Sequence, residues 1–279
     1  MKGEHAVRLR LRLSWTSENQ IPIHYHAMVQ AAIYHTLEPS LAAFIHDHGI
    51  AYQARQFRLF TFSRLMGPYR LSSDKQWIHF TADSELVISS PLDSLLQSLA
   101  RRLLDHSTLR IASSAAEAVE IHAEKTPMLH AHQVTLRTLS PIVVYNTMLR
   151  PDQRKYTLYR APNEPEFGQL IESNLRHKAA ALAQWGGGQP LPNPSRPLAI
   201  RVHQSRLHVM KYRDIIIKGH SGTFTLTGDP SLLRLGIDSG LGSKNAQGFG
   251  CVAWIHASGE RKEDQNDATR YADISEELS

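Results

Sequence analysis

The residues best suited to hold an anion lie near the end of the chain, where five glycines fall within residues 236–250. Because glycine lacks a Cβ atom, such a backbone can approach a ligand closely and present its N–H groups to negative charge. A lysine inside the stretch adds a fixed positive charge. A tight turn that needs positive φ angles is the competing interpretation. The candidate binding residues are Gly240, Gly242, Lys244, Asn245, Gly248 and Gly250.

Histidine and arginine patterns offer two further kinds of chemistry. Three His-x-His pairs begin at His24, His46 and His130, but no matched cysteine or carboxylate cluster accompanies them, so we expect no metal site and no cofactor. Two groups of basic side chains suit the phosphates of a nucleic acid, although solvated strands and loops carry similar groups. These groups are Arg8, Arg10 and Arg12, and then Arg150, Arg154, Lys155 and Arg160.

The charge is divided unevenly along the chain. The whole sequence has 31 Lys and Arg against 26 Asp and Glu, a formal net charge of +5. Residues 259–279 hold seven acids and three bases, a balance of −4, which leaves +9 on residues 1–258. A basic body indicates a polyanionic partner such as nucleic acid, and we expect the acidic tail to be disordered.

Composition limits the class of protein. A hydrophobic fraction of 42% and a charged fraction of 20% are typical of a folded globular protein. The single cysteine, Cys251, excludes an intramolecular disulfide framework, and no secretory leader opens the sequence. No run of 18 apolar residues is present to cross a bilayer. We therefore expect a cytoplasmic protein without a membrane partner.

The elements that must position these residues can be read from the hydrophobic pattern. In the first half, strict alternation predicts a strand at 7–15, and helical spacing predicts a helix at 23–37 that ends before Pro39. A short helical segment at 41–48, strands at 57–63 and 77–82, a helix opened by Ser90 and Pro91, and a strand at 109–121 follow. This βαββαβ order is that of a split-βαβ sandwich.

The second half repeats this order. A strand-like segment at 134–144 precedes the clearest helix of the chain, at 164–185. Extended segments at 198–209, 212–218 and 223–227, a brief helix opened by Asp229 and Pro230, and a last strand at 252–255 complete it. We therefore predict an α+β protein of two tandem ferredoxin-like (RRM-like) domains, residues 1–126 and 127–258, followed by the tail at 259–279.

The glycine-rich stretch GLGSKNAQGFG (240–250), placed just before the last strand, resembles a signature of the repeat-processing endoribonuclease family of CRISPR systems, in the RAMP superfamily. Four other segments agree with that family, and the resemblance covers nearly all of residues 5–256. The four segments are AIY at 32–34, LAAFIHD at 41–47, RLFTFS at 58–63 and LSPI at 139–142.

The resemblance implies metal-independent cleavage of precursor transcripts within each CRISPR repeat, which supplies guide RNAs to an effector complex. In similar family members a tyrosine on the first helix, a histidine just after it and a basic residue on the next strand form the active centre. Here these roles fall to Tyr34, His46 and Arg58. A similar family member carries a lysine at the position of Arg58. The implied partner is repeat RNA, bound by a monomer or a homodimer.

These side-chain types suit cleavage by attack of the 2′-OH on the neighbouring phosphate. A histidine, with an ordinary pKa of about 6.5, can protonate the leaving 5′ oxygen, which contributes roughly 10² to 10⁴ in rate. A tyrosine can orient the 2′-OH unless nearby cations lower its pKa enough for it to ionise. An arginine can hold the scissile phosphate. The expected product carries a 2′,3′-cyclic phosphate.

Other interpretations stay open at this point. Tyr34 could belong to the edge of the core, Arg58 could be a solvated strand residue, and His48 could take the place of His46. The main alternative function is a catalytically inactive RNA-binding subunit of the same superfamily. A third is an unrelated two-domain enzyme whose glycine loop binds a phosphorylated small molecule.

Overall fold

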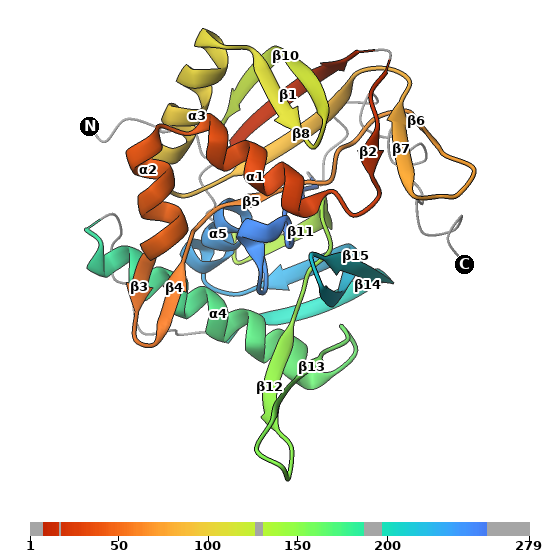
Figure 1. The fold of residues 1–279 in the computed structure, drawn as a ribbon. Coiled ribbons are helices and arrows are strands. Elements are labelled where there is room, and N and C mark those ends of the chain that lie inside the picture. The colour runs from red at the N-terminus through yellow and green to blue at the C-terminus, as the bar shows by residue number, and fades with distance from the viewer. Residues whose placement is uncertain (1–7, 17, 126–130, 187–196, 256–279) are drawn as a thin grey trace.

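The computed structural model describes residues 8–16, 18–125, 131–186 and 197–255, which form two antiparallel sheets of matching strand order (Figure 1). In each half the core of the fold runs strand, helix, strand, strand, helix, strand, and the last strand pairs beside the first. This connectivity confirms the prediction of an α+β protein with two tandem ferredoxin-like domains. The tail at 259–279 lies outside the described residues.

The first sheet is built around β1 (Arg8–Trp15), which pairs with β8 (Ser84–Ser89) on one side and with β10 (Ser114–Glu124) on the other. Because side chains alternate along a strand, the leucines of β1 enter the core and its arginines Arg10 and Arg12 face the other way. Helices α1 (His26–Thr36) and α3 (Asp93–Asp105) contribute buried apolar stripes to that core. The strand order is β5 (Thr61–Phe62), β8 (Ser84–Ser89), β1 (Arg8–Trp15), β10 (Ser114–Glu124) and β9 (Thr108–Ile111).

The hydrophobic pattern did not predict strand β8. It predicted the corresponding strand of the first domain at residues 77–82 instead. Strand β7 (Trp77–Phe80) pairs instead with β2 (Ile21–Pro22) and β6 (Tyr69–Leu71) in a separate small sheet. Residues 86–88 of β8 are all fully buried, so the strand lacks the alternation that marks a half-exposed one. The prediction failed because a strand covered on both faces shows no period of two.

The predicted strand at 57–63 is also divided. Its beginning belongs to β4 (Arg55–Phe57), which forms a hairpin with β3 (Ile50–Tyr52), and its end is β5. Leu59, with a φ of 51°, breaks the extended chain between them, so Arg58 lies in a connecting segment. The hairpin reaches the second half, where the Tyr52 ring lies 5.8 Å from that of His177.

The second sheet has the order β14 (Ala199–Tyr212), β15 (Ile215–Thr227), β11 (Gln133–Thr138) and β16 (Val252–Trp254). The segment predicted at 212–218 includes the end of β14, the turn at 213–214 and the start of β15, and the segment predicted at 223–227 is the end of the same long strand β15. Helix α4 (Pro165–Gln184) agrees with its prediction, and α5 (Pro230–Ser239) begins where Asp229 accepts a hydrogen bond from the Ser231 N–H at 2.8 Å.

A second hairpin was not predicted and projects from the body of the protein (Figure 1). It consists of β12 (Tyr145–Leu149) and β13 (Lys155–Tyr159), and residues 147–155 are all exposed. Before it, residues 142 and 143 make only isolated bridges to His220 and to the glycine-rich loop, so the predicted strand at 134–144 ends early. Among the described residues, no helix is long and apolar enough to cross a membrane.

Candidate functional site

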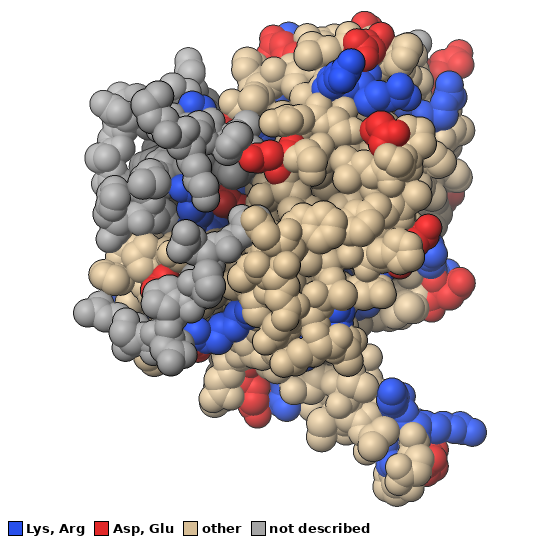
Figure 2. All heavy atoms as spheres, turned by 90° about the vertical axis from the view of Figure 1, so that its left-hand side faces the viewer, with Lys and Arg blue, Asp and Glu red and all other residues tan. Residues whose placement is uncertain are grey.

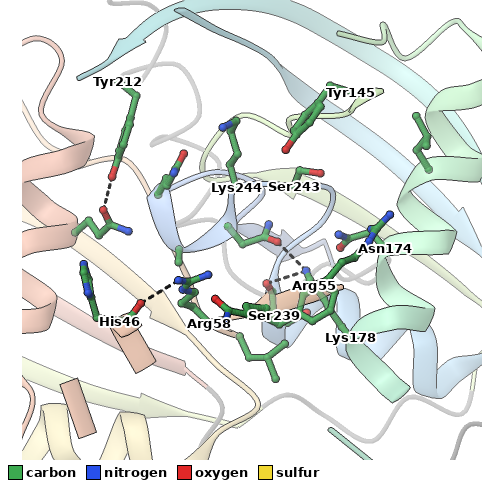
Figure 3. Close-up of a pocket in the computed structure, with 18 of the residues that line it drawn as sticks. His46, Arg55, Arg58, Tyr145, Asn174, Lys178, Tyr212, Ser239, Ser243 and Lys244 are labelled. Carbon is green, nitrogen blue, oxygen red and sulfur yellow. Dashed lines mark hydrogen bonds between the residues drawn. The ribbon is translucent and has the colours of Figure 1, made fainter. Parts of the chain in front are cut away.

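A cavity of about 870 Å³ lies between the two halves (Figure 3). The first half contributes α1, the end of the π-helical turn η1 (Phe44–His48) and residues 55–59, and the second contributes α4, the start of β12, the tip of the β14–β15 hairpin and the glycine-rich loop. The described lining includes no Asp or Glu but several bases, so the cavity suits an anion. The basic residues are His46, Arg55, Arg58, Lys178, Arg213 and Lys244.

The structure brings Tyr34, His46 and Arg58 together in one wall of this cavity. The rings of Tyr34 and His46 meet edge to face, with their centres 5.2 Å apart. The Arg58 guanidinium donates a hydrogen bond from Nη2 to the His46 carbonyl oxygen at 2.9 Å. His46 therefore contacts both Tyr34 and Arg58, each of which is 12 positions away in the sequence.

Local backbone geometry explains how His46 is held. Helix α2 (Pro39–Ala43) continues into η1, which ends at Gly49 with a φ of 60°. A Cβ atom on Gly49 would lie 2.8 Å from the Phe57 carbonyl oxygen, so the turn requires glycine. The side chain of His46 is 64% exposed and lines the cavity, whereas His48 does not line it and lies 6.2 Å from the Phe44 ring.

Asp47 is a neighbour that the sequence reasoning did not single out. Its Oδ1 lies 2.8 Å from His46 Nδ1, and this hydrogen bond lowers the pKa of the Asp47 carboxyl. With Nδ1 engaged, Nε2 is the ring nitrogen left to exchange a proton with a ligand. A carboxylate next to a candidate histidine in the sequence is the signal that would have identified it.

The hydroxyl of Tyr34 is protonated at neutral pH. Burial raises the pKa of Tyr34 to about 12, and the nearby Arg58 guanidinium lowers it only in part. Nearby cations therefore do not lower the pKa of Tyr34 enough for its phenol to ionise at neutral pH. Tyr34 can orient a hydroxyl by hydrogen bonding, but it is not a ready base.

A pair of side chains from different halves closes the cavity beside Tyr34. The Tyr212 hydroxyl, at the tip of the β14–β15 hairpin, donates a hydrogen bond to Gln30 Oε1 on α1 (Figure 3). Gln30 and Tyr34 are four residues apart, so they lie on the same face of the helix. The sequence reasoning missed both Gln30 and Tyr212, although the i, i+4 spacing from Tyr34 marks the first of them.

The glycine-rich loop is fastened from within by Lys178 of α4 (Figure 3). The Lys178 ammonium donates to the carbonyl oxygens of Gly240 at 2.7 Å and Ser239 at 3.3 Å, which lie at the C-terminal end of α5. It also donates to Asn245 Oδ1 at 2.8 Å. Asn245 Nδ2 in turn donates to the carbonyl oxygens of Leu241 and Phe249. The Asn245 side chain, predicted to bind RNA, is thus fully occupied inside the loop.

The glycines of this loop serve close packing. A Cβ atom on Gly250 (φ 74°) would lie 2.0 Å from the Leu241 carbonyl oxygen, and one on Gly248 (φ 86°) would lie 2.4 Å from the Phe62 ring of the first half. The N–H groups of Gly248 and Gly250 both donate to backbone carbonyls of the protein. These features favour the turn interpretation at both positions.

The loop nevertheless presents a cation to the cavity. Lys244 adopts a left-handed backbone conformation with a φ of 62°, and its Nζ lies 5.6 Å from the centre of the Tyr145 ring. Burial lowers the pKa of Lys244. The loop therefore acts as a rigid mount that holds Lys244 in the wall of the cavity.

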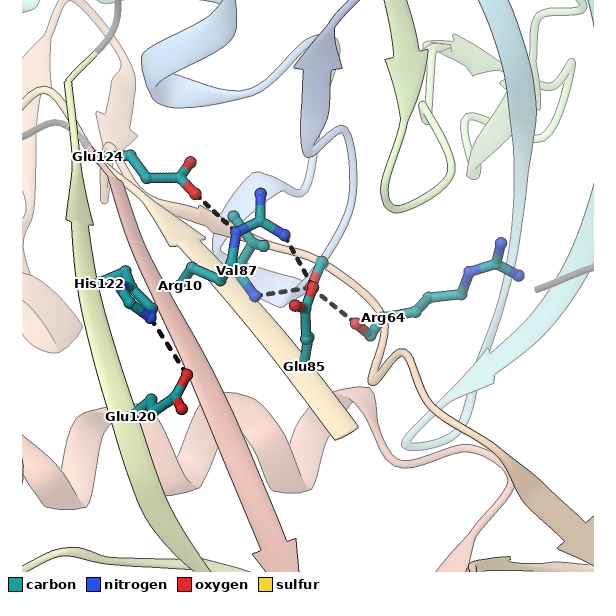
Figure 4. Close-up of polar contacts among 8 residues, drawn as sticks. Arg10, Arg64, Glu85, Val87, Glu120, His122 and Glu124 are labelled. Carbon is teal, nitrogen blue, oxygen red and sulfur yellow. Dashed lines mark hydrogen bonds and ion pairs between the residues drawn. The ribbon is translucent and has the colours of Figure 1, made fainter. Parts of the chain in front are cut away.

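The other predicted basic residues are divided between two environments. Arg8 is buried and donates to the Val252 carbonyl oxygen at 2.7 Å, and Arg10 lies between Glu85 and Glu124, with which it forms ion pairs (Figure 4). By contrast, three bases occupy the exposed end of the β12–β13 hairpin, which projects at the bottom of Figure 2. These are Arg150, Arg154 and Lys155.

Two further observations concern cofactors and the hairpin. Among the described residues, no group of three or more His, Cys, Asp or Glu side chains is arranged to hold a metal. On the hairpin, Arg150 lies over the Tyr156 ring at 5.7 Å from its centre. A cation beside a partly exposed aromatic ring is suited to contact both a phosphate and a base.

Comparisons with known proteins agree with this architecture. The CRISPR-associated endoribonuclease Cas6 1 of Methanocaldococcus jannaschii is 25% identical over 261 residues, which are 92% of this chain and 96% of that protein. The CRISPR-associated endoribonuclease Cas6 of Pyrococcus furiosus is 25% identical over 84% of this chain and 83% of that protein. A solved structure from a Cas6-related gene of Pyrococcus furiosus matches with a TM-score of 0.76 at 20% identity, covering 91% of this chain and all of that one.

Two family models divide the chain between them. The model described as the N-terminal part of CRISPR-associated protein Cas6 matches residues 20–122, and the model of the C-terminal part matches residues 123–254. Together they cover residues 20–254, which include every described residue that lines the cavity, while β1 lies before them. The chain therefore belongs to the Cas6 family of CRISPR-associated proteins.

Proposed function

We propose that this chain is an endoribonuclease that cleaves CRISPR precursor transcripts within the repeat, without a metal ion, and leaves a 2′,3′-cyclic phosphate. The observation that carries this proposal is the contact of Tyr34, His46 and Arg58 in one wall of a cavity lined by bases. The names of the curated relatives, both Cas6 endoribonucleases, support the same class of activity.

In this mechanism the 2′-OH next to the scissile phosphate attacks phosphorus, and the bond from phosphorus to the 5′ oxygen breaks. His46 Nε2 gives its proton to the departing 5′ oxygen, while its Nδ1 is held by Asp47. Tyr34, protonated, donates to or accepts from the 2′-OH and fixes its direction. The 2′-OH proton passes to solvent water, which can reach this part of the cavity because His46 is exposed.

The negative charge that develops on the phosphorane needs stabilising cations. Arg58, whose guanidinium is tied to the His46 backbone, stands beside the general acid and can hold a phosphate oxygen. Lys244 provides a second positive charge in the wall of the same cavity. The hairpin bases Arg150, Arg154 and Lys155 are placed to contact RNA that extends beyond the cavity.

The test is a cleavage assay on repeat RNA in EDTA, with His46→Ala and, as its matched control, His48→Ala. We expect His46→Ala to lower the cleavage rate by roughly 10² to 10⁴ and to leave RNA affinity nearly intact. His48→Ala should cleave as the parent does. A substrate with a 2′-deoxy sugar at the cleavage point should bind without being cut.

Four outcomes would contradict the proposal. Cleavage that needs magnesium would contradict a metal-independent reaction, and cleavage of the 2′-deoxy substrate would exclude attack by the 2′-OH. Loss of activity in His48→Ala but not in His46→Ala would move the general acid. Tight repeat binding with no cleavage in any condition would identify the chain as a catalytically inactive RNA-binding subunit.

A further inference from the structure

A second hollow, here called the α1 groove, lies on the other side of helix α1 from the catalytic cavity. Its volume is about 470 Å³, and it is bounded by α1, the end of α3 and strand β9. Residues 30 and 34 of α1 line the cavity, whereas Met28, Ala32 and His35, at i, i+4 and i+7, line the groove. One helix therefore separates the two sites, and an α-helix with its side chains is only about 10 Å across.

The rim of the α1 groove is basic. Arg102 and Arg110 supply guanidinium groups and His35 and His106 supply imidazoles, and none of the described lining residues is Asp or Glu. His35 and Arg102 lie in the last turns of α1 and α3, where a helix dipole favours cations. That explanation does not extend to Arg110, which points outward from β9. Four donors thus converge from three different elements.

The two arginines of the groove differ from those elsewhere on the first sheet. Arg10 and Arg12 are neutralised by ion pairs with carboxylates. In the part of the chain that the structure describes, the guanidinium groups of Arg102 and Arg110 make no such pair. The hydrogen bond with Ser40 is the largest cause that lowers the pKa of the Glu38 carboxyl, and the charge of Arg102 also contributes. The Glu38 side chain caps helix α2. The groove therefore retains free donors for an external anion.

We propose that the α1 groove binds backbone phosphates of the RNA strand on one side of the cleavage point. This rests on the proposed function, because it extends the RNA path from the cavity across α1. The described lining includes no Phe, Tyr or Trp ring on which a free nucleotide could stack its base. An open basic groove with such a lining suits a passing phosphodiester chain.

The test measures RNA affinity and its salt dependence for the double variant Arg102→Gln/Arg110→Gln of the full chain. The matched control is Arg70→Gln/Arg101→Gln, which removes the same charge from exposed positions that line neither site. Three RNAs are compared: a short one that spans only the cleavage point, and two that extend it on the 5′ or the 3′ side. All carry a 2′-deoxy sugar at the cleavage point so that binding alone is measured.

We expect the groove variant to bind one of the two extended RNAs about tenfold more weakly and the short RNA as tightly as the control does. The slope of log affinity against log salt should fall by about 1.4 for that RNA, as expected for two lost contacts to a single strand. Equal affinities and slopes in the two double variants for all three RNAs would overturn the proposal.

Two further measurements complete the test. One distinguishes an RNA phosphate from a free phosphate as the ligand of the groove, and the other distinguishes failure of the groove proposal from failure of the proposed function. If free AMP or inorganic phosphate binds the parent and not the groove variant, while RNA affinity is unchanged, the groove holds a small anion and the RNA path is wrong. The cleavage rate at saturating all-ribose RNA should be the same in the groove variant and its control. If the parent itself does not cleave, the proposed function fails, yet the binding comparison still decides the role of the groove.

Discussion

The two ends of the cavity differ in how they hold their titratable groups. At one end His46 is mostly exposed, its ring lies edge to face with that of Tyr34, and its Nδ1 is hydrogen-bonded to Asp47. At the other end Lys178 is 3% exposed and fastens the glycine-rich loop with three hydrogen bonds. The exposed end can exchange protons with solvent and substrate, whereas the buried end fixes geometry.

This difference predicts that changes at the two ends separate into effects on rate and effects on stability. An exposed hydrogen-bonded pair contributes little to the free energy of unfolding, whereas a buried polar group left without partners costs much more. The four predictions below test that separation, beginning with the largest change.

Replacing Gly250 by alanine should cause the largest loss of stability. The new Cβ atom would meet the Leu241 backbone oxygen at 2.0 Å, at a φ of 74°. We expect a loss of at least about 3 kcal/mol in the free energy of unfolding, measured by denaturant titration. The control is Gly186→Ala, because Gly186 has a φ of 85° with nothing within 4 Å, and it should lose about 1 kcal/mol. Equal losses would mean that the loop yields easily and is not a rigid mount.

Replacing Lys178 by methionine, which has a similar shape, tests the fastening itself. At pH 8 folded Lys178 is largely a neutral amine with two N–H groups, so methionine removes two hydrogen bonds to buried acceptors and we expect a loss of about 2 kcal/mol. Denaturant titration checks this value. Because Lys244 would lose its fixed position, the KM for repeat RNA should rise more than kcat falls. An unchanged free energy of unfolding would show that the hydrogen bonds of Lys178 do not stabilise the loop.

The pH dependence of stability provides a sharper test of the same residue. Burial lowers the pKa of Lys178 from 10.5 to about 7 in the folded protein. Between those two values the unfolded chain binds the proton and the folded chain does not, so raising the pH favours the folded state. The stability advantage of the parent over Lys178→Met should therefore grow from pH 7 toward pH 10, by at most about 1.4 kcal/mol per pH unit. A constant difference across this range would show that Lys178 does not titrate there.

Replacing Asp47 by asparagine should have the smallest effect on stability. The Asp47 and His46 side chains are both more than 60% exposed, so the loss should stay below about 1 kcal/mol. Cleavage should slow by up to about tenfold, since the amide aligns the imidazole less well. A loss of stability with an unchanged cleavage rate would make Asp47 a structural residue only.

The sequence was informative where chemistry or periodicity is local. Helix α4 and the start of α5 at Asp229 were predictable because spacing and capping are properties of neighbouring residues. Tyr34, His46 and Arg58 could be selected through the family resemblance, and their roles stay predictions.

The sequence was silent where partners are distant along the chain. The helical spacing places Lys178 on the buried face of α4, but its role comes from residues 61 to 67 positions away, which no local pattern indicates. The same holds for Tyr212 and Gln30, which are 182 residues apart. Strand β8 was missed for a different reason, since burial on both faces removes the alternation that identifies a strand.

The bond from Arg8 to Val252 has a consequence for how the protein matures during synthesis. It connects the first strand of the fold to the last, across 244 residues. Thr61 reinforces this connection by donating to the Phe249 carbonyl oxygen at 2.9 Å. A nascent chain that has not yet released its last strand from the ribosome lacks both bonds and the loop that carries Lys244. The cavity is therefore assembled only after residues 240–252 have left the ribosome, so a product truncated before them would fold without a finished site.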